Sequence, residues 1–211
     1  MTIKELIGQM IRDKIIDERI PWHWSWGDKD YCDRLFRYVF RMVDGTIDEY
    51  EHLPEYDEVI DWMTDTSDKG LLFIGDCGRG KSVILNYVLP VLFRMKGRTL
   101  RVVHAQDLHK EHPFQQGGSY YRRPETYLDL LERSAFPAVD ELGVEGLVND
   151  YGEKTEGFNL ILNAAERFHR PVFVSTNLTE EQLLNRYGER TTDRLTHLCR
   201  TIHFKGESMR R

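Results

Sequence analysis

Eight consecutive residues, from Gly75 to Ser82, carry the strongest chemical signal in the sequence. They read GDCGRGKS, the spacing G-x-x-x-x-G-K-S that is typical of a loop that binds a polyphosphate. Three glycines leave room for backbone N–H groups to wrap the phosphates where a helix begins, Lys81 can reach the β- and γ-phosphates, and the Ser82 hydroxyl can hold Mg²⁺. We therefore predict ATP and Mg²⁺ as cofactors, bound by Gly75, Asp76, Cys77, Gly78, Arg79, Gly80, Lys81 and Ser82.

A pair of adjacent carboxylates, Asp140 and Glu141, follows an apolar run about 60 residues after this loop. Such a pair at the end of a strand suits a magnesium site with a base that activates water. We predict that Asp140 helps to order Mg²⁺ and that Glu141 polarises the attacking water. Pro137 removes a hydrogen bond from the sheet, so we expect it at the beginning of the strand.

Polar groups that could complete the site lie further along the chain. The apolar run 172–174 ends in Ser175, Thr176 and Asn177. A polar side chain there, beside the strand of the phosphate-binding loop, could orient water near the γ-phosphate. Arg190 and Arg194 are four residues apart in a helical pattern from 189 to 198, so both project from one face of that helix.

The composition fits one domain of ordinary size with a short appendage, because the 211 residues are 40% hydrophobic and 30% charged. The formal net charge of −6 argues against a protein that grips nucleic acid by bulk charge, so any such contact must be local. The three cysteines form no metal-binding or disulfide pattern, which favours a reducing, cytoplasmic location. No targeting segment or membrane span is predicted.

After residue 70, apolar runs typical of buried strands alternate with helical patterns. This alternation predicts an α/β fold with a parallel sheet and helices on both faces. Strands are expected at 71–74, 98–105, 135–141, 172–177 and 200–204, and helices at 83–95, 125–133, 154–169, just after 179, and at 189–198. Pro90 predicts a kink or an early end in the first of these helices.

The first part of the chain shows three helical patterns, at 2–18, 29–42 and 56–63, and the first of them begins with a capping box, Thr2 and Glu5. We therefore divide the chain into a helical, partner-binding N-terminal segment, 1–65, and an ATPase domain, 66–211. Three tryptophans between 22 and 26 either pack on the core or serve as anchors for a partner.

The polar loop 111–124 holds two adjacent tyrosines and two adjacent arginines at 120–123. These side chains could stack on bases and neutralise phosphates of single-stranded DNA. A solvated loop without such a role is the alternative.

The blocks GLLFIGDCGRGKS, AVDELGVE, RPVFVSTNLTEEQL and YGERTTDRL, with a terminal IHFKGESMRR, together resemble the DnaC/IstB-type AAA+ ATPases. This family includes bacterial and phage replicative-helicase loaders and transposition helper ATPases. The resemblance covers about residues 68–211. It implies a P-loop NTPase of the AAA+ type with a five-stranded sheet in the order 5-1-4-3-2, ATP bound between subunits, and no C-terminal helical lid.

The resemblance also implies roles for single residues. Asn177 would be the first sensor. Arg190 or Arg194, of which we favour Arg194, would be the arginine finger that reaches the γ-phosphate in a neighbouring subunit. The implied assembly is a homo-oligomer in the ATP state that loads a replicative helicase, engaged through the N-terminal segment, on single-stranded DNA. Arg79 and the run 136–138 depart from the usual pattern of the family, which leaves the turnover rate open.

Three other functions are compatible with the motifs. A transposition helper ATPase would use the same site but bind a transposase. A P-loop kinase would need an acceptor pocket and usually an arginine-bearing lid, whereas the adjacent acids and Asn177 fit attack by water. An ATP-gated scaffold would bind ATP and scarcely hydrolyse it, and a comparison with Glu141→Gln separates it from an ATPase.

Overall fold

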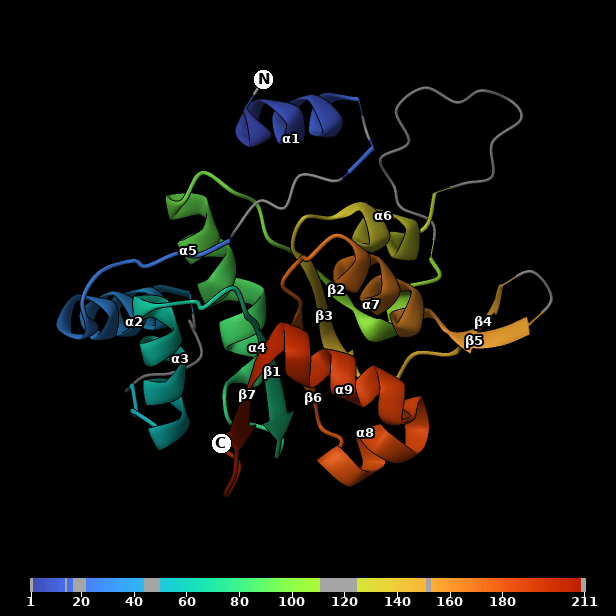
Figure 1. Cartoon of the computed structure of the whole chain (residues 1–211). Helices are drawn as coiled ribbons and strands as arrows, with labels where there is room; N and C mark the ends of the chain where they lie inside the picture. The colour runs from blue at the N-terminus through green and yellow to red at the C-terminus, as the bar shows by residue number, and fades with distance from the viewer. Residues whose placement is uncertain are drawn as a thin grey trace.

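A parallel five-stranded sheet forms the centre of the computed structural model, which describes residues 2–13, 15–16, 22–43, 50–110, 125–150 and 153–209 (Figure 1). Its strands are β1 (Gly70–Gly75), β2 (Arg101–His104), β3 (Pro137–Leu142), β6 (Phe173–Thr176) and β7 (Cys199–Phe204). They lie in the order β2-β3-β6-β1-β7, and every pairing is parallel. Counted from β7 this is the predicted order 5-1-4-3-2, so the predicted fold class is confirmed. The predicted contact loop 111–124 lies outside the described residues.

Helices cover both faces of the sheet, as predicted (Figure 1). Side chains alternate along each strand, so that Leu71 and Phe73 point to one face while Leu72 and Ile74 point to the other. The first face is covered by α2 (Lys29–Val43), α3 (Pro54–Thr64), η1 (Ile84–Val88) and α5 (Leu89–Met95). The second face is covered by α6 (Tyr127–Arg133), α7 (Gly157–Arg167), α8 (Glu180–Tyr187) and α9 (Glu189–Leu198).

The helix after the phosphate-binding loop does not end at Pro90. It starts as α4 (Lys81–Val83), continues through the π-helical turn η1 and goes on as α5 to Met95. In the π-helical turn the Leu89 N–H bonds to the Ile84 carbonyl, five residues back. The wider turn just before Pro90 accommodates a residue that has no N–H, which is why the helix continues. Pro137 is the first residue of β3, where it was predicted.

One pair of strands was not predicted. β4 (Leu147–Asp150) and β5 (Glu153–Glu156) form an antiparallel pair outside the main sheet. The predicted helix 154–169 was therefore wrong over its first three residues, and α7 begins at Gly157. The apolar stripe of the predicted helix starts only at Phe158 in the sequence, so the pattern gives no support for a helix over 154–156.

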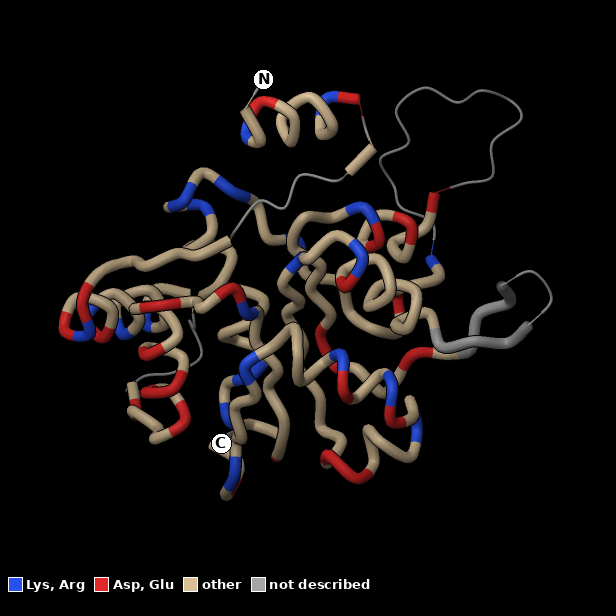
Figure 2. The backbone as a smooth tube through the Cα atoms, in the orientation of Figure 1, with Lys and Arg blue, Asp and Glu red and all other residues tan. Residues whose placement is uncertain are grey.

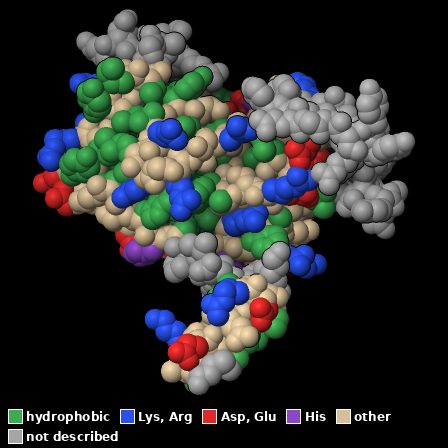
Figure 3. Space-filling model, turned by 90° about the horizontal axis from the view of Figure 1, so that it is seen from above, with side chains coloured by type: hydrophobic (Ala, Val, Ile, Leu, Met, Phe, Trp, Pro, Cys, Tyr) green, Lys and Arg blue, Asp and Glu red, His purple; other side chains and the backbone are tan. Residues whose placement is uncertain are grey.

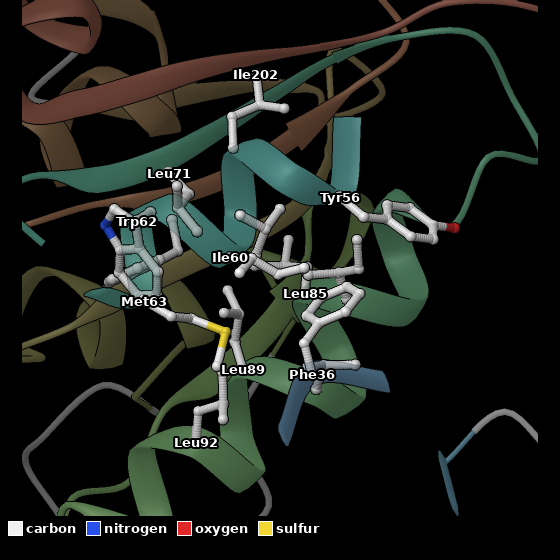
Figure 4. Close-up of a cluster of buried hydrophobic side chains, with 14 of the residues drawn as sticks. Phe36, Tyr56, Ile60, Trp62, Met63, Leu71, Leu85, Leu89, Leu92 and Ile202 are labelled. Carbon is white, nitrogen blue, oxygen red and sulfur yellow. The ribbon is translucent and has the colours of Figure 1, made fainter. Parts of the chain in front are cut away.

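The described N-terminal residues 22–43 and 50–64 share one hydrophobic core with the sheet. Trp22 and Trp26 are 6% and 9% exposed and pack beside Trp62, Phe93 and other aromatic rings. The backbone at Trp24 exchanges two hydrogen bonds with Thr66, which holds this stretch against the sheet. Figure 4 shows side chains of α2 and α3 meeting those of β1, η1, α5 and β7 in this core. Burial thus favours packing over partner binding for Trp22 and Trp26, and the boundary at residue 65 stays a prediction.

Helix α1 (Ile3–Arg12) has a different character. Its capping box, between Thr2 and Glu5, is formed as predicted, but the helix ends at Arg12 and has no buried residue. Figure 3 shows it as a lobe that projects from the body. Ile3, Leu6 and Ile7 leave an apolar face exposed. Within the described ranges, no helix combines the length and the apolar character needed to cross a membrane.

Candidate nucleotide-binding site

The phosphate-binding loop connects the end of β1 to the first turn of α4, as the motif requires. Gly75, Gly78 and Gly80 have φ angles of +128°, +77° and +87°, a region that other residues rarely adopt. A Cβ at Gly75 would lie 2.0 Å from the Phe204 carbonyl oxygen, and one at Gly80 would lie 2.4 Å from the Tyr56 hydroxyl. Both the backbone conformation and the available space therefore require glycine in this loop.

The Lys81 ammonium group lies over the loop. Its Nζ donates hydrogen bonds to the carbonyl oxygens of Gly75 (2.7 Å) and Asp76 (2.6 Å), and the residue is 5% exposed. These carbonyls orient the ammonium group beside the N–H groups at the start of a helix. This combination suits a polyphosphate.

The side chain of Arg79 points away from the phosphate-binding face of the loop. Its Nε donates to Glu55 Oε1 of α3 at 2.5 Å, and its Nη1 donates to the Glu207 carbonyl at 3.2 Å. The side chains of Arg79 and Glu55 are only 10% and 6% exposed. The hydrogen bond to Glu55 is the main cause that raises the pKa of Arg79 above its usual value. The Tyr56 hydroxyl donates to the Arg79 carbonyl at 3.2 Å, so α3 holds both the side chain and the backbone of this loop residue.

The chain after β7 holds the loop from a second side. The Gly206 N–H donates to Asp76 Oδ2 at 3.0 Å, and the Met209 N–H donates to the Gly78 carbonyl at 3.0 Å. The loop is therefore held in place by α3 on one side and by the residues after β7 on the other.

The predicted magnesium ligands meet at the carboxyl ends of β1 and β3. Ser82 Oγ donates to Asp140 Oδ1 at 3.0 Å, and Asn86 Nδ2 donates to Asp140 Oδ2 at 2.7 Å. Ser175 at the end of β6 also donates to Asp140 Oδ1. Asp140 is only 6% exposed, and these donors hold its carboxylate in one orientation. Sequence reasoning missed Asn86, although its position four residues after Ser82 places it on the same helical face.

The backbone turns sharply at Glu141. This residue has a φ of +57°, and the pairing of β3 with β6 gains an extra residue between Val139 and Leu142. A bulge of this kind redirects a side chain next to a functional site. The Glu141 carboxylate accordingly reaches across to β2, where Oε2 lies 2.9 Å from His104 Nε2.

His104 was not among the predicted site residues. Its Nδ1 accepts a hydrogen bond from the Gln106 N–H at 3.3 Å, which leaves Nε2 as the donor to Glu141 in the neutral ring. The only signal in the sequence was its position near the end of the predicted strand 98–105. The structure adds that His104 pairs with Asp140 in the parallel register of β2 and β3.

Asn177 follows β6 directly and is exposed. Thr176 pairs with Ile74 of β1, and its hydroxyl donates to the Leu142 carbonyl of β3 at 2.6 Å. Asn177 therefore leaves the sheet between the strand of the phosphate-binding loop and the strand of the two acids. This place matches its predicted role, which stays a prediction.

The two candidate arginines of α9 have different surroundings. Arg194 Nε pairs with Glu166 Oε2 of α7 at 2.6 Å, its Nη1 donates to Asn163, and its side chain is 14% exposed. Arg190 is exposed and has no partner among the described residues. The structure thus leaves Arg190 available to a second molecule, whereas Arg194 is engaged within its own chain. The choice between the two stays a prediction.

The residues just after β3 also contact α8, the helix that precedes α9. Glu145, whose side chain is fully buried, accepts hydrogen bonds from the Gly143 N–H at 2.7 Å and from the Tyr187 hydroxyl. Arg186 of α8 donates to the carbonyls of Gly143 and Glu145. These contacts set the position of α8, and through it the start of α9, relative to β3.

The residues present fit a magnesium nucleotide. The loop conformation and Lys81 suit the phosphates, and the oxygens of Ser82 and Asp140 are the ligand type that Mg²⁺ prefers. In the described part of the chain, no group of three His, Cys, Asp or Glu side chains could hold a metal ion alone.

The sheet order and this loop define a P-loop α/β protein, and comparison with solved structures narrows the fold. The crystal structure of DnaI matches with a TM-score of 0.55 and 18% identity, over 79% of this chain and 93% of that one. The crystal structure of the DnaC helicase loader matches with a TM-score of 0.56 and 17% identity, over 82% and 99%. No protein-family model and no curated protein matches the sequence. The resemblance to DnaC-type AAA+ proteins is therefore confirmed as a likeness of fold.

Proposed function

We propose that this protein is an ATP-dependent loader of a replicative helicase. The observation that carries the proposal is the hydrogen bond between Ser82 and Asp140. It joins the phosphate-binding loop to β3, where Asp140 is followed directly by Glu141. The solved DnaC helicase loader, which has the same fold, supports a role in DNA replication. MgATP, once bound, supplies a phosphoanhydride bond that water can cleave.

In this proposal each residue of the site has one task. Lys81 and the loop N–H groups bind the phosphates, and Ser82 and Asp140 hold the metal ion. Glu141 takes a proton from the attacking water, while His104 keeps its carboxylate in place. Asn177 orients the same water, and an arginine of α9 from a neighbouring copy completes the site in a homo-oligomer.

ATP hydrolysis tests the chemistry. We expect MgATP turnover without any added metabolite, loss of turnover in Lys81→Ala, and tight ATP binding without turnover in Glu141→Gln. Equal turnover in the parent and Glu141→Gln, with and without single-stranded DNA, contradicts the ATPase assignment. A requirement for a metabolite would instead indicate a kinase.

A mixing experiment tests the shared site. Lys81→Ala copies supply an intact arginine, and Arg190→Ala copies supply an intact loop, so a mixture should recover part of the activity. The same mixture with Arg194→Ala distinguishes the two arginines, and we expect recovery with Arg190→Ala because Arg194 is held by Glu166. No recovery with either variant excludes an arginine finger in trans.

The exposed apolar face of α1 is the part of the N-terminal segment best suited to a helicase. We expect Ile3→Asp/Ile7→Asp to abolish co-purification with the helicase and to leave ATP binding intact. Gln9→Asp, on the polar side of the same helix, is the matched control. Co-purification with a transposase instead would support the transposition helper.

A further inference from the structure

Two stretches of the sequence that contain no acidic residue lead into neighbouring parts of the sheet. No Asp or Glu occurs from 77 to 106 or from 167 to 179. The first stretch runs from the phosphate-binding loop through β2, the second runs from the end of α7 through β6, and both strands flank β3. Because the strands are parallel, the residues that precede them lie at one edge of the sheet, opposite to the phosphate-binding loop.

The part of this edge that precedes β2 and β6 gathers positive charge in a chain whose net charge is −6. We call it the basic edge, and its members are Arg94, Lys96, Arg98, Arg101, Arg167 and Arg170. Figure 2 shows the basic residues at the end of α5 and before β2, and Figure 3 shows Lys and Arg spread over the middle of the same face. Arg94, Arg98 and Arg167 are exposed and have no carboxylate partner in the described ranges.

An exposed aromatic ring lies at this edge. Phe168 is 39% exposed, and the guanidinium carbons of Arg167 and Arg170 lie 5.3 Å and 4.6 Å from its ring centroid. The Arg170 guanidinium is fixed from behind by the carbonyls of Glu132 and Ser134, at 2.9 Å and 3.2 Å. An aromatic ring beside one anchored and one exposed cation forms a platform on which an unpaired base can stack.

We propose that the basic edge binds single-stranded DNA, with its cations on the phosphates and a base stacked on Phe168. The inference rests on the proposed function for the identity of the nucleic acid. Five of its six cations are arginines, which suit phosphate oxygens, and stacking requires a base that is not paired. The basic edge lies at the edge of the sheet opposite to the phosphate-binding loop, so DNA and ATP do not compete for the same surface.

Fluorescence anisotropy with a labelled oligo-dT strand, measured over a range of salt concentrations, tests the surface in the full chain. Arg94→Glu/Arg98→Glu should weaken binding at least tenfold and lower the slope of log affinity against log salt by about 1.4, which corresponds to two lost phosphate contacts. Phe168→Ala should weaken binding by about fivefold or more without changing the slope. Arg34→Glu/Arg41→Glu, which makes the same charge change on exposed positions of α2, is the control and should bind within about twofold of the parent.

Unchanged binding of Arg94→Glu/Arg98→Glu overturns the inference, as does an equal loss in the control. Unchanged DNA binding with loss of helicase binding would instead assign the edge to an acidic protein partner. A different result would contradict the proposed function alone. In that case the parent binds oligo-dT at its basic edge but neither hydrolyses ATP nor binds a helicase. Thermal unfolding and ATP binding of each variant show whether it is folded.

Discussion

The ion pair between Glu55 and Arg79 yields the most quantitative prediction. Glu55→Ala leaves a guanidinium with a 10% exposed side chain and without its hydrogen-bonded carboxylate. Removing one partner of a buried ion pair costs about 3–5 kcal/mol, because the remaining charge is buried without compensation. For a chain of this length, each kcal/mol lowers Tm by about 2–4 °C, so we expect a decrease of about 6–20 °C.

A matched pair on the surface provides the control. Arg37 Nε lies 2.8 Å from Asp33 Oδ1, a distance close to the 2.5 Å of the buried pair, but the two side chains are 39% and 32% exposed. Asp33→Ala should therefore cost only about 0.5 kcal/mol. Urea denaturation followed by circular dichroism measures both variants.

A double variant separates the loss of the pair from the burial of one charge. Glu55→Leu/Arg79→Met replaces both charges with apolar side chains, and we expect it to be clearly more stable than Glu55→Ala. If Glu55→Ala is no less stable than Asp33→Ala, the pair is not buried as described, and the reasoning fails.

Three further predictions concern the site. His104→Ala should lower kcat for ATP about tenfold, equivalent to about 1.4 kcal/mol, and leave KM within about twofold, because His104 contacts Glu141 and not the loop; a change in KM alone would contradict this role. Asn86→Leu should destabilise the protein by about 1–3 kcal/mol in urea, because a buried oxygen of Asp140 loses a donor; unchanged stability would refute that contact. At pH 8 a thiol reagent should modify the exposed Cys77, and MgATP should slow that reaction. Burial raises the pKa of the Cys199 thiol to about 12, so at this pH only about one Cys199 side chain in 10⁴ is a thiolate, and Cys199 should react far more slowly. Mass spectrometry measures both rates of modification. If Cys199 in the native protein is modified as fast as Cys77, Cys199 is not buried.

The sequence predicted the sheet well because its strands are short, mostly apolar runs, and three of them, β1, β3 and β6, lead into residues of the predicted site. Burial of both faces makes such runs almost continuous, and the β1 residues Leu71 to Ile74 show this pattern. The β4–β5 pair was missed because its polar residues carry no apolar alternation. The sequence left open whether the tryptophans between 22 and 26 pack in the core or bind a partner, because tryptophan is typical of both kinds of site.

Contacts between distant residues could be predicted only where both residues belong to a motif. Ser82 and Asp140 could be paired in advance because their motifs share one ligand. Asn86 and His104 belong to no motif, and only the register of β2 against β3 and the turn of the helix bring them to the two acids.

Arg79 shows how a departure from a motif can have a structural cause. In the sequence it occupies a loop position where a small or hydroxyl residue is usual, which left the turnover rate open. In the structure its side chain leaves the phosphate-binding face and pairs with Glu55, 24 residues earlier, while its carbonyl accepts from Tyr56. The arginine therefore fits a loop that packs against α3, and any rearrangement of the loop at position 79 has to move or break a buried ion pair. That constraint links the N-terminal segment to the nucleotide site by direct contact.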